Sequence, residues 1–123
     1  MTEKLQVLNA EIADTKIILE VDESYPVSQL TPKGQILVDS DSFAFIYIAE
    51  KEDEYVYIVL HKDIWLSIKK GLAANLKLYL SNGQDNLELI DWKEEMEYLI
   101  DNIEGNGNYG EEMEQAVTSV FSK

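Results

Sequence analysis

The chain has 123 residues, a length typical of one domain, and 46% of them are hydrophobic, which is enough for a packed core and too many for a disordered chain. It has no cysteine, which excludes disulfides, thiolate metal ligands and thiol nucleophiles. Twenty-four acidic residues stand against ten lysines and no arginine, so the formal net charge is −14. This charge disfavours binding to nucleic-acid phosphates and to anionic membranes, which both depend on clustered basic side chains.

The first residues lack the basic and apolar segments of an export signal. The longest apolar run, residues 43–49, is far shorter than the roughly 20 residues of a membrane-spanning helix. The absence of cysteine also fits a reducing compartment. We therefore expect a cytoplasmic protein that consists of one acidic domain, residues 1–123, with no membrane association.

The first third of the chain has the pattern of short strands joined by turns. Residues 5–12 and 16–21 are apolar-rich and flank a short polar turn, which predicts a hairpin. Residues 22–34 contain both prolines and predict a loop, which can include a short strand at 27–30. Residues 35–38 predict a further strand, followed by a bend.

Residues 43–50 and 55–60 are dense in aromatic and β-branched side chains and are separated by a charged turn, which indicates a second hairpin. Both faces of residues 43–48 are apolar, so we expect this hairpin at the centre of the sheet, covered on both sides. The register stays open, because a shift of one residue turns Tyr55 and Tyr57 to the opposite face.

The second half of the chain predicts helices around one more hairpin. Apolar residues at helical spacing indicate a helix over residues 62–74, weakened by Gly71 in its last turn. Residues 76–80 and 87–90 flank an Asn-Gly turn. Residues 91–94 have the spacing of a capping box with Asp91 at the N-cap, and an apolar stripe continues from Trp92 to Ile103. A last helix follows the glycine-rich residues 105–110.

Together these elements predict an α+β fold: a mostly antiparallel sheet of about six short strands, one inserted helix and two C-terminal amphipathic helices. Both tryptophans, Trp65 and Trp92, fall on apolar helix faces, and we interpret them as core residues. The apolar stripes of the two C-terminal helices can be covered by the sheet or by a second copy, so a homodimer is compatible with the pattern.

No motif supports a catalytic site or a cofactor. Residues 105–110 match G-x-G-x-x-G, but a helix precedes them and the chain ends soon after, so we interpret them as a turn between helices. Asp39 and Asp41 are weak candidates for a hard cation, against an ordinary role in a turn. A small enzyme or ligand-binding domain could assemble a site from His61, Asp39 and Tyr109.

The acidic last third of the chain is the feature that stands out most. Between residues 85 and 114, eleven acidic side chains accompany a single lysine, Lys93. Like charges at helical spacing destabilise a helix, so a basic protein partner, or mimicry of nucleic-acid phosphates toward such a protein, would make use of them. A merely solvated face is the alternative. The candidate interaction surface consists of Glu94, Glu97, Asp101, Glu104, Glu111 and Glu112.

Two stretches, residues 30–41 (LTPKGQILVDSD) and 102–113 (NIEGNGNYGEEM), resemble a family of small acidic proteins of unknown function from Bacillus and related Gram-positive bacteria. The resemblance extends along most of the chain. It implies a bacterial, cytoplasmic setting and brings no activity, ligand or catalytic residue. The leading hypothesis from the sequence is therefore a non-enzymatic interaction or regulatory module.

Overall fold

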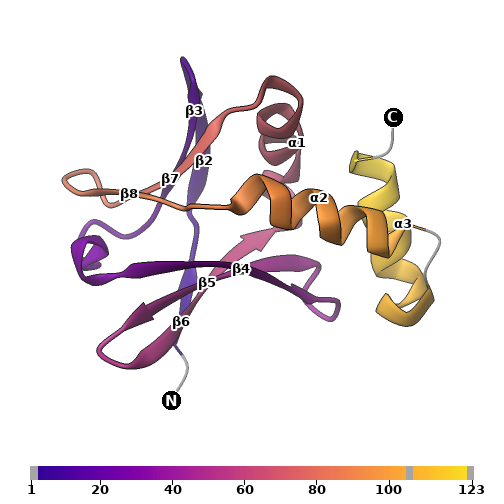
Figure 1. The fold of residues 1–123 in the computed structure, drawn as a ribbon, viewed down its shortest axis with the longest axis horizontal. Helices are drawn as coiled ribbons and strands as arrows, with labels where there is room; N and C mark the ends of the chain where they lie inside the picture. The colour runs from indigo at the N-terminus through magenta and orange to yellow at the C-terminus, as the bar shows by residue number, and fades with distance from the viewer. Residues whose placement is uncertain (1–2, 105–106, 122–123) are drawn as a thin grey trace.

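The computed structural model describes residues 3–104 and 107–121, and within them eight strands form two four-stranded sheets beside three α-helices (Figure 1). The first sheet has the order β1-β6-β5-β4, and the second has the order β2-β3-β7-β8. In the first sheet the strands are β1 (Glu3–Gln6), β4 (Thr31–Asp39), β5 (Ala44–Lys51) and β6 (Glu54–His61). In the second they are β2 (Asn9–Ala13), β3 (Lys16–Glu20), β7 (Lys77–Ser81) and β8 (Asn86–Glu88). The helices are α1 (Trp65–Ala74), α2 (Trp92–Ile103) and α3 (Glu111–Phe121).

The α+β class is confirmed, but the prediction of one mostly antiparallel sheet of about six strands is wrong. Each sheet contains one parallel pair, β1 with β6 and β3 with β7. The first predicted strand breaks at Val7 and Leu8, so that β1 joins one sheet while β2 pairs with β3 in the other. The amino-terminal segment thus connects the two sheets, which lie at one side of the molecule while the helices gather at the other (Figure 1).

The hairpin of β5 and β6 occupies the centre of the first sheet, as predicted. Its two turn residues, Glu52 and Asp53, both have positive φ (52° and 65°), the backbone of a type I′ turn that matches the twist of paired strands. The register pairs Tyr57 with Ile48. Tyr55 and Tyr57 therefore lie on the face opposite Phe45, which settles the question that the sequence left open.

The main core lies between the sheets and the helices. Phe45 of β5, Trp65 of α1 and Phe121 of α3 form an aromatic cluster with ring centroids 5.3 to 6.2 Å apart. Trp92 is also buried, so the interpretation of both tryptophans as core residues is confirmed. Because aromatic contacts of this kind add to the burial of area, Phe121 attaches the last turn of α3 to the central strands.

Gly71 allows α1 to approach the second sheet closely. A Cβ at this position would overlap the side chain of Ile17 on β3 and lie 3.2 Å from Cη2 of Trp92. The sequence suggested only that Gly71 weakens the helix, and that cost remains. The structure shows what the glycine provides in exchange, which is room for the Ile17 side chain between helix and sheet.

A buried tyrosine joins the central hairpin to the start of α2. The hydroxyl of Tyr47 donates a hydrogen bond to the Ile90 carbonyl oxygen (2.7 Å) and accepts one from the Gly34 N–H (3.2 Å). Burial raises the pKa of the Tyr47 phenol well above its ordinary value of 10. The neutral phenol is therefore the form that the fold requires.

Two local predictions are wrong. Asp91 has a left-handed backbone (φ 61°) and its side chain makes no capping hydrogen bond, so the predicted capping box does not form. Its carboxylate lies beside Gly34 instead, where a Cβ would be 2.8 Å from Oδ2 of Asp91. The short strand allowed at residues 27–30 is a 3₁₀ turn, Val27–Gln29.

In the described part of the chain, no helix is long and apolar enough to span a membrane.

Candidate functional site

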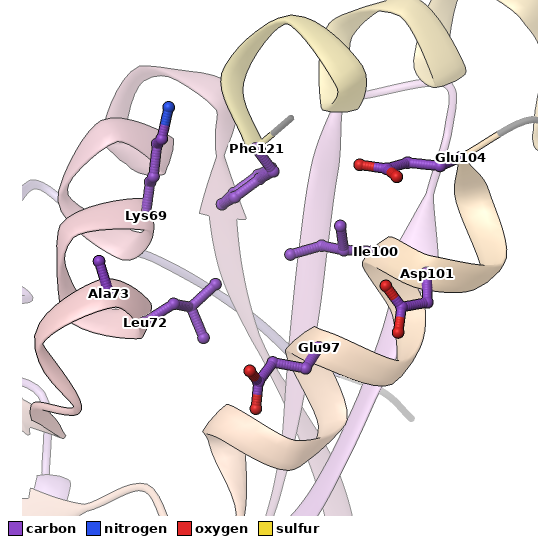
Figure 2. A pocket seen from close by; sticks show the side chains of 8 residues that line it. All are labelled: Lys69, Leu72, Ala73, Glu97, Ile100, Asp101, Glu104 and Phe121. Carbon is purple, nitrogen blue, oxygen red and sulfur yellow. The ribbon is translucent and has the colours of Figure 1, made fainter. Parts of the chain in front are cut away.

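A groove runs between the three helices (Figure 2). We call it the three-helix groove, and its volume is about 650 Å³. Its lining residues come from α1, α2 and α3 and are Lys69, Leu72, Ala73, Glu97, Ile100, Asp101, Glu104 and Phe121. Three of the six acidic residues in the predicted interaction surface are among them.

The floor of the three-helix groove is apolar. Leu72 of α1, Ile100 of α2 and Phe121 of α3 point into the same space (Figure 2). Ile100 is buried, while Leu72 and Phe121 are half-buried and keep part of their surface open to the groove. Because Phe121 also packs against Phe45 and Trp65, the floor is held in place by the main core.

The rim along α2 is acidic. Glu97, Asp101 and Glu104 are exposed and follow one another at spacings of four and three residues, which places them on one side of the helix over about 10 Å. Among the lining residues that the structure describes, Lys69 on α1 is the only cation. Within residues 3–104 and 107–121, none of these three carboxylates forms an ion pair with a lysine.

These carboxylates are placed at some cost to the helix. Asp101 lies in the last turn of α2 and Glu104 is its C-cap, where the helix dipole disfavours negative charge. The last turn of α2 contains no basic residue to compensate. Lys93, at the other end of the helix, donates a hydrogen bond to Oδ1 of Asn75 (2.8 Å). The arrangement leaves a negative rim beside an apolar floor.

The groove continues along α3. Glu104 also lines a neighbouring hollow of about 500 Å³, together with Glu114, Gln115, Thr118 and Ser119. On α3, Glu114, Thr118 and Phe121 are spaced as one helix face. The shared residue Glu104 joins the two hollows, so the open surface follows both α2 and α3.

The other predicted acidic residues lie elsewhere. Glu111 and Glu112, at the start of α3, line a separate hollow of about 450 Å³ beside Phe43 and Tyr109. Glu94 is exposed on α2 and lines none of these hollows. The structure therefore divides the predicted interaction surface into a groove set and a set outside the groove.

The residues of the alternative small-molecule site do not line one common hollow. Asp39 lines a hollow on the first sheet, Tyr109 lines the hollow at the start of α3, and His61 lines neither. Nε2 of His61 lies 2.9 Å from Oε1 of Gln6. Oδ1 of Asp39 accepts the N–H of Ser42 (3.3 Å), a turn contact. In the described ranges, no three His, Asp or Glu side chains gather in a way that could hold a metal ion, Asp39 and Asp41 included.

Sequence reasoning missed the apolar half of the groove. Phe121 belongs to the stripe of the last helix and Leu72 to that of the inserted helix, and the sequence connected neither residue with the acidic surface. Partial burial of one residue at the end of each stripe is not visible in the spacing itself.

Residues 105 and 106 of the glycine-rich stretch lie outside the described residues, and Gly107–Tyr109 form a 3₁₀ turn between α2 and α3.

Fold and groove define a small α+β protein whose helices carry an acidic, partly apolar surface. Comparison with known proteins adds the family: the chain belongs to UPF0738, a family of unknown function, whose sequence profile matches residues 5–121. It is 42% identical over 122 residues to the UPF0738 protein GWCH70_0774 of Geobacillus sp. (strain WCH70), covering 98% of each chain. It is 39% identical over 121 residues to the UPF0738 protein YjbL of Bacillus subtilis (strain 168), covering 98% of this chain and 99% of the other. No solved structure matches.

Proposed function

We propose that this protein is an interaction module whose three-helix groove binds a basic, amphipathic helical segment of a partner protein. The observation that carries the proposal is the combination, in one groove, of an apolar floor (Leu72, Ile100 and Phe121) with a rim of carboxylates that form no ion pair with the described lysines. An amphipathic helix places its apolar face in such a groove, and its basic residues would meet the rim. The cysteine-free composition fits a cytoplasmic setting for this interaction.

The spacing of the rim defines what the partner segment must carry. Glu97, Asp101 and Glu104 span about 10 Å along α2, which corresponds to two helical turns. A helix lying beside α2 would present lysines or arginines at similar spacing. Leucine-like side chains on the adjacent face of that helix would contact the apolar floor. Lys69 on the opposite side of the groove favours an acidic or neutral residue on the other flank of the bound helix.

Charge alone does not account for the groove. Solubility is favoured by net charge anywhere on the surface, but it does not require carboxylates at the C-terminal end of α2, where the dipole opposes them. Nor does it require Leu72 and Phe121 to leave part of their apolar surface open beside them. A bound basic helix would compensate the charge and cover the apolar floor at once.

The test uses a defined probe: a synthetic peptide of about 15 residues with leucines on one helical face and lysines on the other. We expect amide chemical-shift changes in the ¹H–¹⁵N spectrum of the labelled protein to concentrate on residues 69–73, 97–104 and 118–121. A peptide of the same leucine pattern with glutamates in place of lysines is the control and should cause no change. Shifts spread evenly over all acidic surfaces would contradict the proposal.

A variant that keeps the charge but blocks the floor separates the two parts of the site. Ala73→Trp fills the groove from α1, where Ala73 is exposed and tolerates a larger side chain. We expect it to weaken binding of the lysine peptide at least about tenfold, a loss of roughly 1.4 kcal/mol. The control is Ala74→Trp, at an exposed position of α1 that does not line the groove. Equal binding by both variants would show that the peptide does not use the floor.

A further inference from the structure

The three-helix groove has two ends, which we name after the rim residues Glu97 and Glu104. Helices α1 and α2 flank the groove and run in opposite directions, with Lys69 of α1 at the level of Glu104 and the end of α1 close to Glu97 (Figure 2). Nζ of Lys93, in the first turn of α2, donates a hydrogen bond to Oδ1 of Asn75, the C-cap of α1 (2.8 Å). The end of α1 and the start of α2 therefore meet at the Glu97 end.

The Glu104 end is strongly negative. Asp101 and Glu104 line the groove there, and Glu114 of α3 lines the neighbouring hollow that Glu104 shares. Lys69 lies at this end as well and balances one of the three carboxylates (Figure 2). Helix α2 ends here without a basic residue in its last turn, so its dipole adds to the negative charge. This end carries excess negative charge that the described residues around it do not compensate.

The Glu97 end is close to neutral. Glu97 is the carboxylate that lines the groove there, and Lys93 precedes it by one helical turn on the same side of α2. The end of α1 is also compensated, because the Leu76 N–H donates to the Gly71 carbonyl oxygen (2.9 Å) and the Lys93 ammonium lies at the C-cap. The two ends of the groove thus differ in both side-chain charge and helix dipole.

If the groove binds a basic amphipathic helix, as proposed above, its charge sets the direction of that helix. We infer that the helix binds antiparallel to α2, with its N-terminus at the Glu104 end. The first N–H groups of a helix lack partners within it and form its positive end, and the carboxylates of Glu104 and Glu114 can accept them. At the other end, the last carbonyl groups of the bound helix meet Lys93, whose ammonium has three donors and uses one on Asn75.

The direction specifies the partner segment further. Its N-terminus lies beside the hollow that Glu114 and Thr118 line on α3. Lysines or arginines that directly precede the helix in the partner chain would therefore reach this hollow and meet its negative charge. Charges at helix ends have modest effects that salt screens, so we expect one direction to be favoured at least about fivefold at low salt.

Paramagnetic broadening of amide signals measures the direction. Two versions of the leucine–lysine peptide, acetylated and amidated so that no terminal charge acts, carry a nitroxide on one added cysteine at the N-terminus or at the C-terminus. The label cannot exchange onto the protein, which contains no cysteine. We expect the N-terminal label to broaden the signals of residues 104 and 114–119, and the C-terminal label those of residues 75, 93 and 97.

The unlabelled peptide separates the two possible failures. If it causes no chemical-shift changes, the proposed function is overturned and the direction with it. If it binds, but the labels broaden the opposite regions, or each label broadens both regions equally, the groove binds the helix and the inferred direction is wrong.

A pair of charge-exchange variants tests the cause of the direction. Lys93→Glu with Glu104→Lys exchanges charge between the two ends of the groove and leaves the net charge at −14. We expect the N-terminal label to broaden residues 75 and 97 of this variant at least as strongly as residues 114–119.

The control exchanges charge at two exposed positions that do not line the groove, Glu23→Lys with Lys33→Glu, and should keep the direction of the wild type. Circular dichroism verifies that both variants are folded. A direction that persists in the groove variant would show that the charges at the two ends do not set it, and would overturn the inference.

Discussion

The central hairpin and the three-helix groove differ in whether their polar and charged side chains have partners. In β5 and β6, six consecutive residues from Ala44 to Ala49 are buried, and the buried polar atoms are paired, as the hydroxyl of Tyr47 shows. Along α2, three carboxylates have no lysine partner among the residues that the structure describes, and two of them lie where the helix dipole opposes them. The hairpin is arranged for stability, whereas the groove retains features that cost stability. We take that difference as the mark of a surface kept for binding.

The largest effect is expected where α1 meets the second sheet. Gly71→Ala places a methyl group against Ile17 and near Trp92, in a part of the molecule that is fully packed. Overpacking of this kind costs about 2–3 kcal/mol of the free energy of unfolding, more than the helix propensity of alanine returns. Urea denaturation followed by tryptophan fluorescence measures the change.

The contact with Ile17 provides a rescue experiment. Ile17→Val removes the methyl group Cδ1 that Gly71→Ala would meet, so the double variant should be more stable than Gly71→Ala alone by about 1 kcal/mol or more. Ile17→Val in the wild-type background should instead be destabilising by about 1 kcal/mol. Additive effects of the two substitutions would show that Gly71 is required for a different reason.

The next effect concerns the tyrosine that joins the hairpin to α2. Tyr47→Phe removes the hydrogen bond to the Ile90 carbonyl oxygen and leaves the Gly34 N–H without its acceptor, which we expect to cost about 1–3 kcal/mol. Tyr55→Phe is the matched control, because Tyr55 is 51% exposed on the same hairpin, and it should change stability by less than about 0.5 kcal/mol. Similar losses in both variants would contradict the role of the Tyr47 hydroxyl.

Alkaline pH tests the same hydroxyl without a structural change. The pKa of Tyr47 is raised in the folded state above its ordinary value of 10, so the folded chain binds the phenolic proton more tightly than the unfolded chain. The stability linked to this proton is fully present below pH 10 and is lost as the pH rises above it. Unfolding curves between pH 8 and 11 should show this loss in the wild type and a smaller one in Tyr47→Phe. Identical pH profiles would refute the assignment.

The smallest effect on stability has the opposite sign and belongs to the groove. Glu97→Gln with Asp101→Asn removes a like-charge pair at four-residue spacing and a carboxylate near the negative end of the helix dipole. We expect thermal unfolding to show a gain of about 0.5 kcal/mol while binding of the lysine peptide decreases. A variant that loses stability would mean that these carboxylates support the fold, and the contrast with the hairpin would fail.

The features that the sequence predicted are local ones. Dense aromatic and β-branched residues over 43–50 and 55–60 specified the central hairpin, and the stripe from Trp92 to Ile103 specified α2, because each pattern is local. The parallel pairs could not be predicted in this way. Strand β1 meets β6, and β3 meets β7, through contacts between distant parts of the chain for which local spacing carries no information.

The same reasoning explains why only half of the candidate site was found. Glu97, Asp101 and Glu104 share a side of one helix, which their spacing shows. The floor needs Leu72 and Phe121 from two other helices, and their meeting depends on how Gly71 and the aromatic cluster position α1 and α3. Asp91 misled for a related reason, since neither its left-handed backbone nor its position beside Gly34, far away in the sequence, follows from local spacing.

The most direct test of the binding role compares two variants of equal charge. One carries Glu97→Gln, Asp101→Asn and Glu104→Gln in the groove, and the other carries Glu94→Gln, Glu111→Gln and Glu112→Gln outside it, so both change the net charge from −14 by +3 to −11. Calorimetric titration with the lysine peptide at about 50 mM salt should show at least about a tenfold loss of affinity for the groove variant and less than about threefold for the other. Equal losses would show that the peptide responds to the overall field of the protein, and would contradict a site in the groove.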